Sequence, residues 1–220
     1  MTEKTIASKK CFIYPSDNAS VCLIQPVDAH DSELLDKEYD AIKELTDTPF
    51  VLAAFFIEDW NKELSPWEAP AVFGKESFGS GANETLMYIT GSLIPFIKNE
   101  YSGITDFFLG GYSLAGLFAL WAGYRTDAFR GVAGVSPSVW FPGWDSFIKS
   151  NKMKAAGTYL SLGDREEKTR NKVMATVGGR IKMQYAALDN DRTLEWNSGN
   201  HFTEPGKRTA KGFAWLINRD

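Results

Sequence analysis

The segment at residues 111–116, Gly-Tyr-Ser-Leu-Ala-Gly, contains a serine in a setting that can make it a nucleophile. It joins an apolar, β-rich run to an apolar helical run. A sharp turn between a strand and a helix forces the serine into a strained backbone conformation, in which side chains two positions before and after it would collide. Gly111 and Ala115 are small enough for that turn. We therefore predict that Ser113 is a nucleophile, against the plainer interpretation of a serine that only caps a helix.

Leu114, directly after the serine, supplies a second part of the same chemistry. Its backbone N–H lies at the predicted start of a helix, where unpaired donors and the helix dipole favour a negatively charged oxygen. The tetrahedral intermediate of acyl transfer carries its charge on such an oxygen. The motif therefore predicts a nucleophile together with one donor of an oxyanion hole.

A nucleophilic serine needs a general base, and the chain contains two histidines. His30 precedes the serine and leads into a predicted helix, so we interpret it as a helix-start residue. His201 lies in a loop after the predicted strand 193–197 and before the last predicted helix. Hydrolases built on a parallel sheet have the chain order serine, carboxylate, histidine, with the histidine on such a late loop. We therefore predict that His201 is the base.

The third member of a triad would be a carboxylate between the serine and the histidine, at the carboxyl end of a strand. The segment after the predicted strand 158–162 offers Asp164, Glu166 and Glu167. Asp164 and Glu167 have the spacing of a capping box, which would employ both at the start of the next helix. Glu166 has no capping role, although it could pair with Arg170 on a helix surface. Glu166 is the first choice, and Glu167, Asp164 or a dyad without an acid stay open.

The elements that would position these residues alternate along the chain. Strands are predicted at 11–14, 21–25, 50–57, 104–109, 131–136, 158–162 and 193–197, and helices at 31–45, 83–98, 114–124, 169–188 and 203–217. The first two strands are joined by a turn-rich connector and are expected to form an antiparallel hairpin at one edge of the sheet. Alternating strands and helices form a mostly parallel sheet with helices on both faces. The pattern predicts one α/β domain over residues 1–220.

Between residues 58 and 82 the chain is irregular and rich in Trp, Pro, Gly and Phe. A long loop in a compact domain is functional or disordered, and this one is too aromatic for disorder. We expect it to pack over the carboxyl ends of the strands, where open α/β sheets bind their ligands. No large lid insertion lies between residues 136 and 158, which favours a compact, open site for short acyl chains or polar alcohols.

The composition is typical of a globular domain without a charged macromolecular partner. The chain has 220 residues, 44% of them hydrophobic and 14% aromatic, and a net charge of −4 with scattered cations. We expect no nucleic-acid and no membrane partner, and a small-molecule substrate instead. The first ten residues are polar and no apolar run could span a bilayer, so we expect a cytoplasmic protein. Cys11 and Cys22 lie in apolar runs and are expected to be buried thiols.

Four segments, in order along the chain, resemble α/β-hydrolase esterases of the esterase D and siderophore-esterase type. They are the turn at 111–116, Val-Ser-Pro-Ser-Val-Trp at 135–140, Leu-Gly-Asp-Arg-Glu at 162–166 and Gly-Asn-His-Phe at 199–202. This group also includes feruloyl esterases and mycolyltransferases. The resemblance extends over most of the chain from residue 50 onward and implies the three-layer α/β-hydrolase fold.

The resemblance also implies roles for individual residues. By position, Ser113 would be the nucleophile, His201 the base and Glu166 the acid. The second oxyanion donor would be a backbone N–H just after the strand 50–57, and Trp60 is our choice for it. The substrate pocket would be lined by aromatic side chains, namely Tyr112, Trp140 and Phe141.

These residues together predict acyl transfer through an acyl-enzyme intermediate, with no metal and no cofactor required. The histidines and cysteines lack the spacing of zinc ligands, and the glycine-containing segments at 74–76 and 79–81 complete neither a P-loop nor a dinucleotide fingerprint. A carboxylic ester hydrolase is the primary prediction. The alternatives are an acyltransferase on the same fold and a hydrolase-fold protein that binds without turnover.

Overall fold

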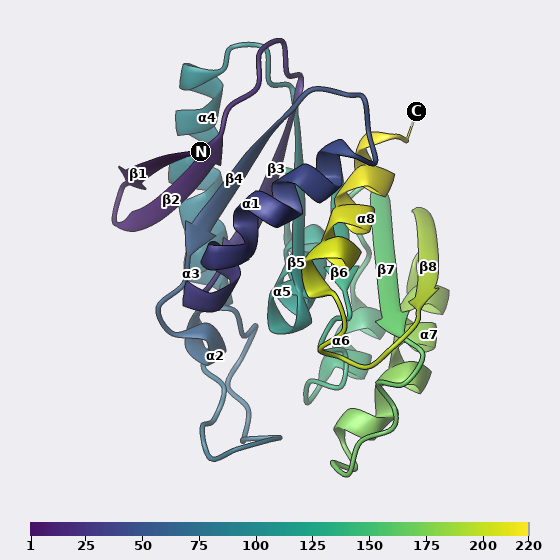
Figure 1. The fold of residues 1–220 in the computed structure, drawn as a ribbon. Coiled ribbons are helices and arrows are strands. Elements are labelled where there is room, and N and C mark those ends of the chain that lie inside the picture. Colours follow the sequence, from purple (N-terminus) through teal and green to yellow (C-terminus); the bar gives the residue numbers. More distant parts are fainter. Residues whose placement is uncertain (220) are drawn as a thin grey trace.

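A computed structural model of the chain describes residues 1–219, which form one sheet with helices on both faces (Figure 1). The strand order is β1-β2-β4-β3-β5-β6-β7-β8, with β3 to β8 parallel and β1 and β2 antiparallel. The strands are β1 (Thr2–Ile6), β2 (Lys9–Tyr14), β3 (Val21–Val27), β4 (Phe50–Phe56), β5 (Asp106–Tyr112), β6 (Gly131–Val135), β7 (Gly157–Gly163) and β8 (Asp191–Asn197). The predicted mostly parallel sheet with an antiparallel N-terminal edge is confirmed.

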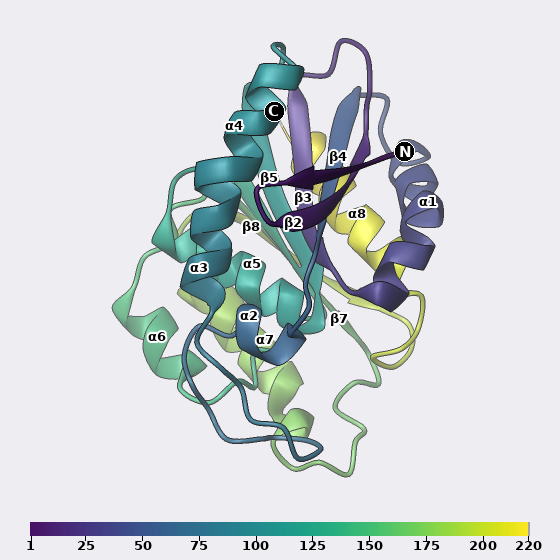
Figure 2. The same cartoon turned by 90° about the vertical axis from the view of Figure 1, so that its left-hand side faces the viewer.

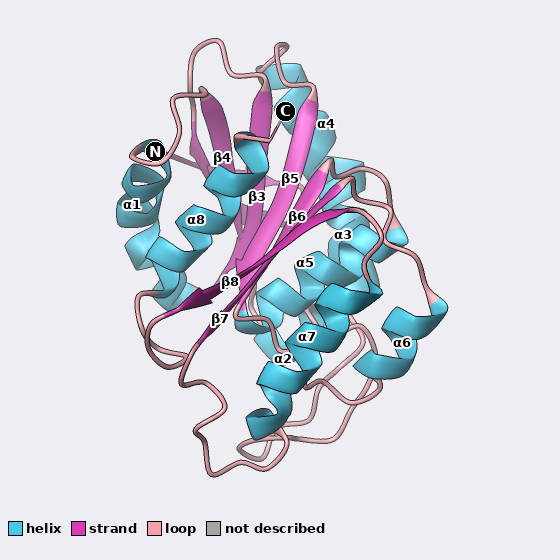
Figure 3. Cartoon of the chain, turned by 90° about the vertical axis from the view of Figure 1, so that its right-hand side faces the viewer, coloured by secondary structure: helices cyan, strands magenta, loops and turns pink. Residues whose placement is uncertain are grey.

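The helices form the two outer layers of a three-layer sandwich. They are α1 (Ala29–Lys43), α2 (Trp60–Glu63), α3 (Ala82–Tyr88), α4 (Ile94–Glu100), α5 (Ser113–Arg125), α6 (Trp144–Ser150), α7 (Val177–Ala187) and α8 (Pro205–Ile217). Helices α1 and α8 lie side by side on one face of the sheet, and α3 to α7 cover the other face (Figures 2 and 3).

Strand β4 shows why the central strands are continuously apolar. Successive side chains of a strand point to opposite faces of the sheet. Val51 and Phe55 accordingly pack in the core under α3 to α5, whereas Leu52 and Ala54 pack in the core under α1 and α8. Because helices cover both faces, each position of the strand needs an apolar residue.

The hairpin predicted at the N-terminal edge is wrong. Strand β4 lies between β2 and β3, so these two strands are not partners. The antiparallel neighbours of β2 are β4 and β1, and β1 forms from the polar first residues, where no strand is predicted, with Thr2 opposite Ile13. An edge strand with solvent on one side lacks the apolar signature of a central strand, which is why the pattern does not reveal it. Cys11 on β2 and Cys22 on β3 are buried, free thiols.

Two predicted helices are not single regular helices over the predicted residues. The helix expected at 83–98 begins at Ala82 and contains a π-helical segment, Ile89–Leu93. Pro95 follows this segment at the second position of α4, and its ring would clash with the preceding turn of a regular helix. The helix expected at 169–188 begins only at Val177, after a 3-10 turn at Met174–Thr176. Helix α6 was not expected at all from its sequence.

The loop between β4 and α3 is ordered around its aromatic side chains, at the end of the molecule that holds the carboxyl ends of the strands (Figure 1). Trp67 donates its indole N–H to the carbonyl oxygen of Pro142 at 2.8 Å, and Ala69 pairs with Phe78 in a short antiparallel bridge. The expected position of the loop is therefore confirmed. No helix within residues 1–219 has both the length and the apolar composition that a bilayer span requires.

Candidate active site

Ser113 lies at the turn between β5 and α5. Its φ of 57° is in the left-handed region, which costs a non-glycine residue about 1–3 kcal/mol. The turn leaves no room for a larger residue at Gly111, since a Cβ there would lie 2.6 Å from the Cβ of Ala115. A strained strand-to-helix turn of this kind can present a serine as a nucleophile above a parallel sheet.

His201 lies in the loop between β8 and α8, and its imidazole bridges the serine to a carboxylate. Nε2 lies 3.1 Å from Ser113 Oγ, and Nδ1 lies 2.7 Å from Glu166 Oε2. The serine and the histidine keep some solvent access, whereas Glu166 is buried. An imidazole that donates from Nδ1 to a carboxylate has Nε2 available to accept the serine proton. The structure therefore brings the three predicted residues into one chain of hydrogen bonds.

The carboxylate of Glu166 is held by neighbours on both of its oxygens. Oε1 accepts hydrogen bonds of 2.7 Å from the backbone N–H of Gly163 and from the hydroxyl of Ser136, and it pairs with Arg208 at 3.2 Å. Burial opposes ionisation, but the hydrogen bond and charge interaction with His201, with the bonds from Ser136 and Gly163, bring the pKa of Glu166 below its ordinary value of 4.5. Glu166 is therefore an ionised carboxylate at neutral pH.

The other two candidate acids have different positions. Asp164 Oδ1 accepts a 2.8 Å hydrogen bond from the backbone N–H of Gly199, and so ties the end of β7 to the histidine loop. The carboxylate of Glu167 lies over the start of α7, where a Cβ on Gly178 would come within 2.2 Å of its Cδ. The capping box proposed for these two residues is wrong, because no helix begins there and residues 164–173 form turns and loop.

Two backbone N–H groups were predicted to form an oxyanion hole. Leu114 lies in the first turn of α5 and Trp60 is the first residue of α2. In the segment before Trp60, Glu58 and Asp59 both donate their N–H groups to the carboxylate of Glu63, at 3.0 Å each. Within residues 1–219, no acceptor is paired with the N–H of Leu114 or of Trp60. Both groups thus remain available as donors.

The three aromatic residues predicted for the pocket differ in their surroundings. Phe141 is fully buried and packs with Phe78 at a ring-centroid distance of 5.0 Å, so its side chain is part of the core. Trp140 retains 5% exposure and packs edge-on against Phe73 at 5.9 Å. Tyr112 uses its hydroxyl to donate a 2.7 Å hydrogen bond to the backbone oxygen of His201. Its contact with the histidine loop makes it part of the site's scaffold.

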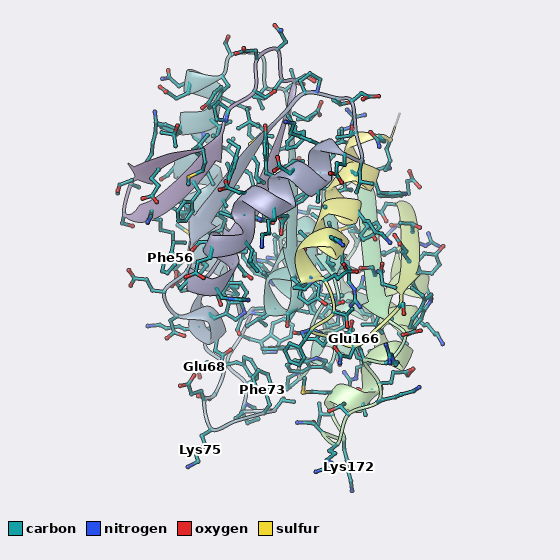
Figure 4. The ribbon with its side chains drawn as sticks, in the orientation of Figure 1. Phe56, Glu68, Phe73, Lys75, Glu166 and Lys172 are labelled. Atoms are coloured by element: carbon teal, nitrogen blue, oxygen red, sulfur yellow. The ribbon has the colours of Figure 1, made fainter. Side chains whose placement is uncertain are left out.

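Two exposed aromatic residues at the site are not singled out by the sequence. Phe202 is 86% exposed, and its ring centroid lies 5.5 Å from that of His201. Phe73 is 49% exposed on the loop between β4 and α3. That loop and the loop that follows Glu166 project beyond the carboxyl edge of the sheet (Figure 4), and Asn171 joins them through a 2.6 Å hydrogen bond to the carbonyl of Val72.

The remaining candidates lie away from this chain of hydrogen bonds. His30 is exposed in the first turn of α1. A cavity of about 1160 Å³ lies between the β1–β2 turn, α2 and α3, and its lining contains none of Ser113, His201 and Glu166. Among residues 1–219, no cluster of His, Cys, Asp and Glu has the arrangement of a metal site.

Comparison with solved structures identifies the fold. An IroE-like serine hydrolase from Shewanella oneidensis superposes with a TM-score of 0.78 at 14% identity, over 97% of this chain and 79% of that one. The siderophore hydrolase EstA from Aspergillus nidulans gives 0.73 at 18% identity, over 96% and 90% of the two chains. Est1E from Butyrivibrio proteoclasticus gives 0.62 at 12% identity, over the whole of both. Protein-family models and curated protein sequences give no match.

The chain has the α/β-hydrolase fold, and the resemblance seen in the sequence is confirmed at that level. At these identities the likeness concerns the fold, and any function must be argued from the site.

Proposed function

We propose that the protein is a serine-dependent carboxylic ester hydrolase that works through an acyl-enzyme intermediate. The observation that supports this most directly is the chain of hydrogen bonds from Ser113 Oγ through His201 to Glu166, with distances of 3.1 Å and 2.7 Å. Its members follow the chain order serine, carboxylate, histidine, and the serine lies on a strained turn. The similar structures from Shewanella oneidensis and Aspergillus nidulans are described as hydrolases, which agrees with the proposal.

The first half of the reaction forms the acyl-enzyme. Ser113 Oγ attacks the ester carbonyl carbon while His201 Nε2 takes its proton. The carbonyl oxygen becomes an oxyanion, which the N–H groups of Leu114 and Trp60 stabilise. Glu166 stabilises the imidazolium through Nδ1. The imidazolium then donates its proton to the leaving alcohol as the carbon–oxygen bond breaks.

The second half returns the enzyme to its starting state. His201 Nε2 removes a proton from water, and the hydroxide attacks the acyl carbon. The resulting oxyanion uses the same two N–H donors, and its collapse releases the carboxylic acid and returns the proton to Ser113 Oγ. An alcohol in place of water would give acyl transfer, which is the alternative reaction.

The surroundings of the serine favour a small acyl group or a polar alcohol. The segment between β6 and β7 contains the short helix α6 and no lid insertion, and the 1160 Å³ cavity beside α2 and α3 does not include the serine. Long-chain lipids need an extended apolar channel, whereas a shallow site accepts short acyl groups. With p-nitrophenyl esters we expect kcat/KM to fall steadily from butyrate to palmitate. A preference for palmitate would overturn the proposed substrate size.

Labelling with a fluorophosphonate probe tests the nucleophile directly. We expect intact mass and peptide mapping to show one adduct, on Ser113, that is lost in His201→Ala. His30→Ala is the matched histidine control and Ser138→Ala the matched serine control, since Ser138 Oγ lies 3.4 Å from Ser113 Oγ. Both controls should label like the wild-type protein.

The outcomes separate the alternatives. Labelling without release of acid in the presence of a good alcohol acceptor would favour the acyltransferase. A folded protein that neither labels nor hydrolyses esters would exclude catalysis by this serine, and the interpretation as a binding protein on the hydrolase fold would replace the present one.

A further inference from the structure

The guanidinium of Arg208 on α8 contacts the carboxyl ends of four neighbouring strands. Nη1 donates to the hydroxyl of Tyr112 at the end of β5, at 3.2 Å, and to that of Ser136 just after β6, at 3.4 Å. Nη1 also donates to Glu166 Oε1 after β7, at 3.2 Å, and Nη2 donates to the carbonyl of Ser198 after β8, at 2.9 Å. One side chain therefore joins the segments that carry the proposed nucleophile, acid and base.

Arg208 is 3% exposed, which is rare for an arginine and requires a partner for its charge. The buried partner is the carboxylate of Glu166. Gly163 leaves the space that the pair occupies, since a Cβ there would lie 3.0 Å from both Arg208 Nη1 and Glu166 Oε1. Such a buried pair is costly to form in general, so its presence beside the histidine calls for a functional explanation.

The contacts of Arg208 extend to both ends of the short loop that carries the base. The carbonyl of Ser198 marks the start of that loop. The hydroxyl of Tyr112, which accepts from Arg208, donates in turn to the backbone oxygen of His201 at 2.7 Å. Removal of the guanidinium would therefore free the loop at its start and weaken its attachment at the histidine.

We propose that Arg208 is a positioning residue, which holds Glu166 and the histidine loop against Ser113 and whose positive charge keeps His201 neutral and ready to accept a proton. With Arg208 present, the pair with Glu166 is neutral, and a proton on the partly exposed His201 adds a net positive charge beside this buried pair. Without Arg208, the same proton would neutralise Glu166 and would be held more tightly. The catalytic consequence rests on the proposed function, whereas the electrostatic effect can be measured without it.

Apart from Glu166, the titratable groups near Arg208 carry no negative charge that balances its positive charge inside the site. Tyr112 of β5 and Tyr159 of β7 face it, and burial is the main cause that raises the pKa of both phenols, so both are uncharged at neutral pH. Glu204, before α8, is exposed and pairs with Lys207. Glu166 is therefore the carboxylate whose charge Arg208 balances inside the site.

The test is an NMR titration of the imidazole signals, in which His30 is an internal reference on α1. In Arg208→Met, we expect the titration midpoint of His201 to rise by about one pH unit and that of His30 to stay constant. In Arg208→Lys, which keeps the charge, the midpoint of His201 should stay near the wild-type value. Lys207→Met, at the exposed neighbouring position, is the matched control and should change neither histidine.

A second pair of variants avoids a buried carboxylate without its cation, which could prevent folding. Glu166→Gln leaves Arg208 as the charge beside His201, and Glu166→Gln with Arg208→Met removes both charges. The proposal requires the midpoint of His201 to be higher in the double variant than in Glu166→Gln, by about one pH unit. An equal or lower midpoint in the double variant, or in folded Arg208→Met against wild type, overturns it.

Ester hydrolysis supplies the catalytic readout. We expect Arg208→Met to lower kcat by about 10- to 100-fold with KM changed by less than about threefold, and to move the acid limb of the kcat/KM profile to higher pH. A change confined to KM would mean that Arg208 contacts substrate and would contradict a positioning role. If the wild-type protein is inert towards esters and fluorophosphonate, the proposed function fails, while the titrations still decide the effect of Arg208 on His201.

Discussion

Tyr112 Oη donates a 2.7 Å hydrogen bond to the backbone carbonyl of His201, so the residue before Ser113 holds the loop that carries His201. The two rings also pack together, with centroids 5.2 Å apart. The loop itself turns sharply at Gly199, where φ is 111° and a Cβ would lie 2.5 Å from Thr203 Oγ1. The distance between Nε2 and Ser113 Oγ is thus set by contacts that join the serine turn to the histidine loop.

We predict that Tyr112→Phe lowers kcat by about 3- to 10-fold with little change in KM. The ring stays, but the loop loses its bond at His201, and a small displacement of the base from Ser113 slows proton transfer. The free energy of unfolding should fall by about 1 kcal/mol, as for a typical lost hydrogen bond. Steady-state kinetics and urea denaturation measure the two effects.

Tyr14→Phe is the matched control for this substitution. Tyr14 Oη donates to Asp36 of α1 at 2.6 Å and takes no part in the hydrogen bonds of Ser113, His201 and Glu166, so its loss should cost similar stability and leave kcat unchanged. An equal decrease in kcat in both variants would show that lost stability, and not the position of the base, accounts for the effect in Tyr112→Phe.

We predict that Gly111→Ala destabilises the protein by about 1–3 kcal/mol and reduces fluorophosphonate labelling of Ser113. The added methyl would lie 2.6 Å from the Cβ of Ala115 and 2.8 Å from its backbone carbon, which cannot move without opening the turn. Gly179→Ala on α7 is the control, because a Cβ there would have no atom within 4 Å and alanine favours a helix. Thermal unfolding measures the stability of both variants. Equal stability would contradict the claim that the turn has no room for a Cβ at Gly111.

We predict that stability depends on pH through Glu38 on α1. Its Oε1 is buried without a hydrogen-bond partner within residues 1–219, and desolvation, with a smaller contribution from Asp31, raises the pKa of Glu38 to about 8. A carboxyl with a raised pKa favours the folded state fully below its unfolded value of 4.5, and this contribution is lost as pH rises towards 8. The wild-type protein should therefore lose stability between about pH 5 and pH 8.

Glu38→Gln removes this dependence, because a neutral amide replaces the protonated carboxyl. We expect the variant to match wild type at pH 5 and to exceed it by on the order of 2 kcal/mol at pH 8, after allowance for partial exposure of the side chain. Glu33→Gln, at an exposed position of the same helix, should follow the wild-type curve. Parallel curves for wild type and Glu38→Gln, from urea denaturation across this range, would contradict the raised pKa.

The sequence predicts the central sheet well because β3 to β7 are buried on both faces and are therefore largely apolar. It fails at the polar edge, where β1 pairs only with β2, and in the order of the first strands, because strand order depends on contacts that periodicity does not contain. Helix α6 is missed because its seven residues, Trp144–Ser150, are too few to show a helical period.

The sequence predicts the site residues that their types and neighbours in the chain identify. It does not predict the residues that only tertiary contacts bring to the site. Ser113 is identified by its small neighbours, and His201 is identified because the sequence contains two histidines. Arg208 gives a weaker signal: it stands four residues before Gly212 and eight before Leu216, and so falls on the buried face of α8. A charged residue on that face needs a buried partner, but only the fold shows that Glu166 provides it.

Substitution of the three neighbouring acids decides which one supports the base. Glu166→Gln should lower kcat by about 10²- to 10⁴-fold with little change in KM, because the amide can neither stabilise the imidazolium nor fix its tautomer. Glu167→Gln should keep activity within about threefold, since that carboxylate lies over the start of α7. Asp164→Asn should also have a small effect, because the amide oxygen can still accept from Gly199. Steady-state kinetics on an acetate ester measures all three variants. If Glu166→Gln is no worse than Glu167→Gln, the enzyme works as a Ser113–His201 dyad and the buried carboxylate serves the fold alone.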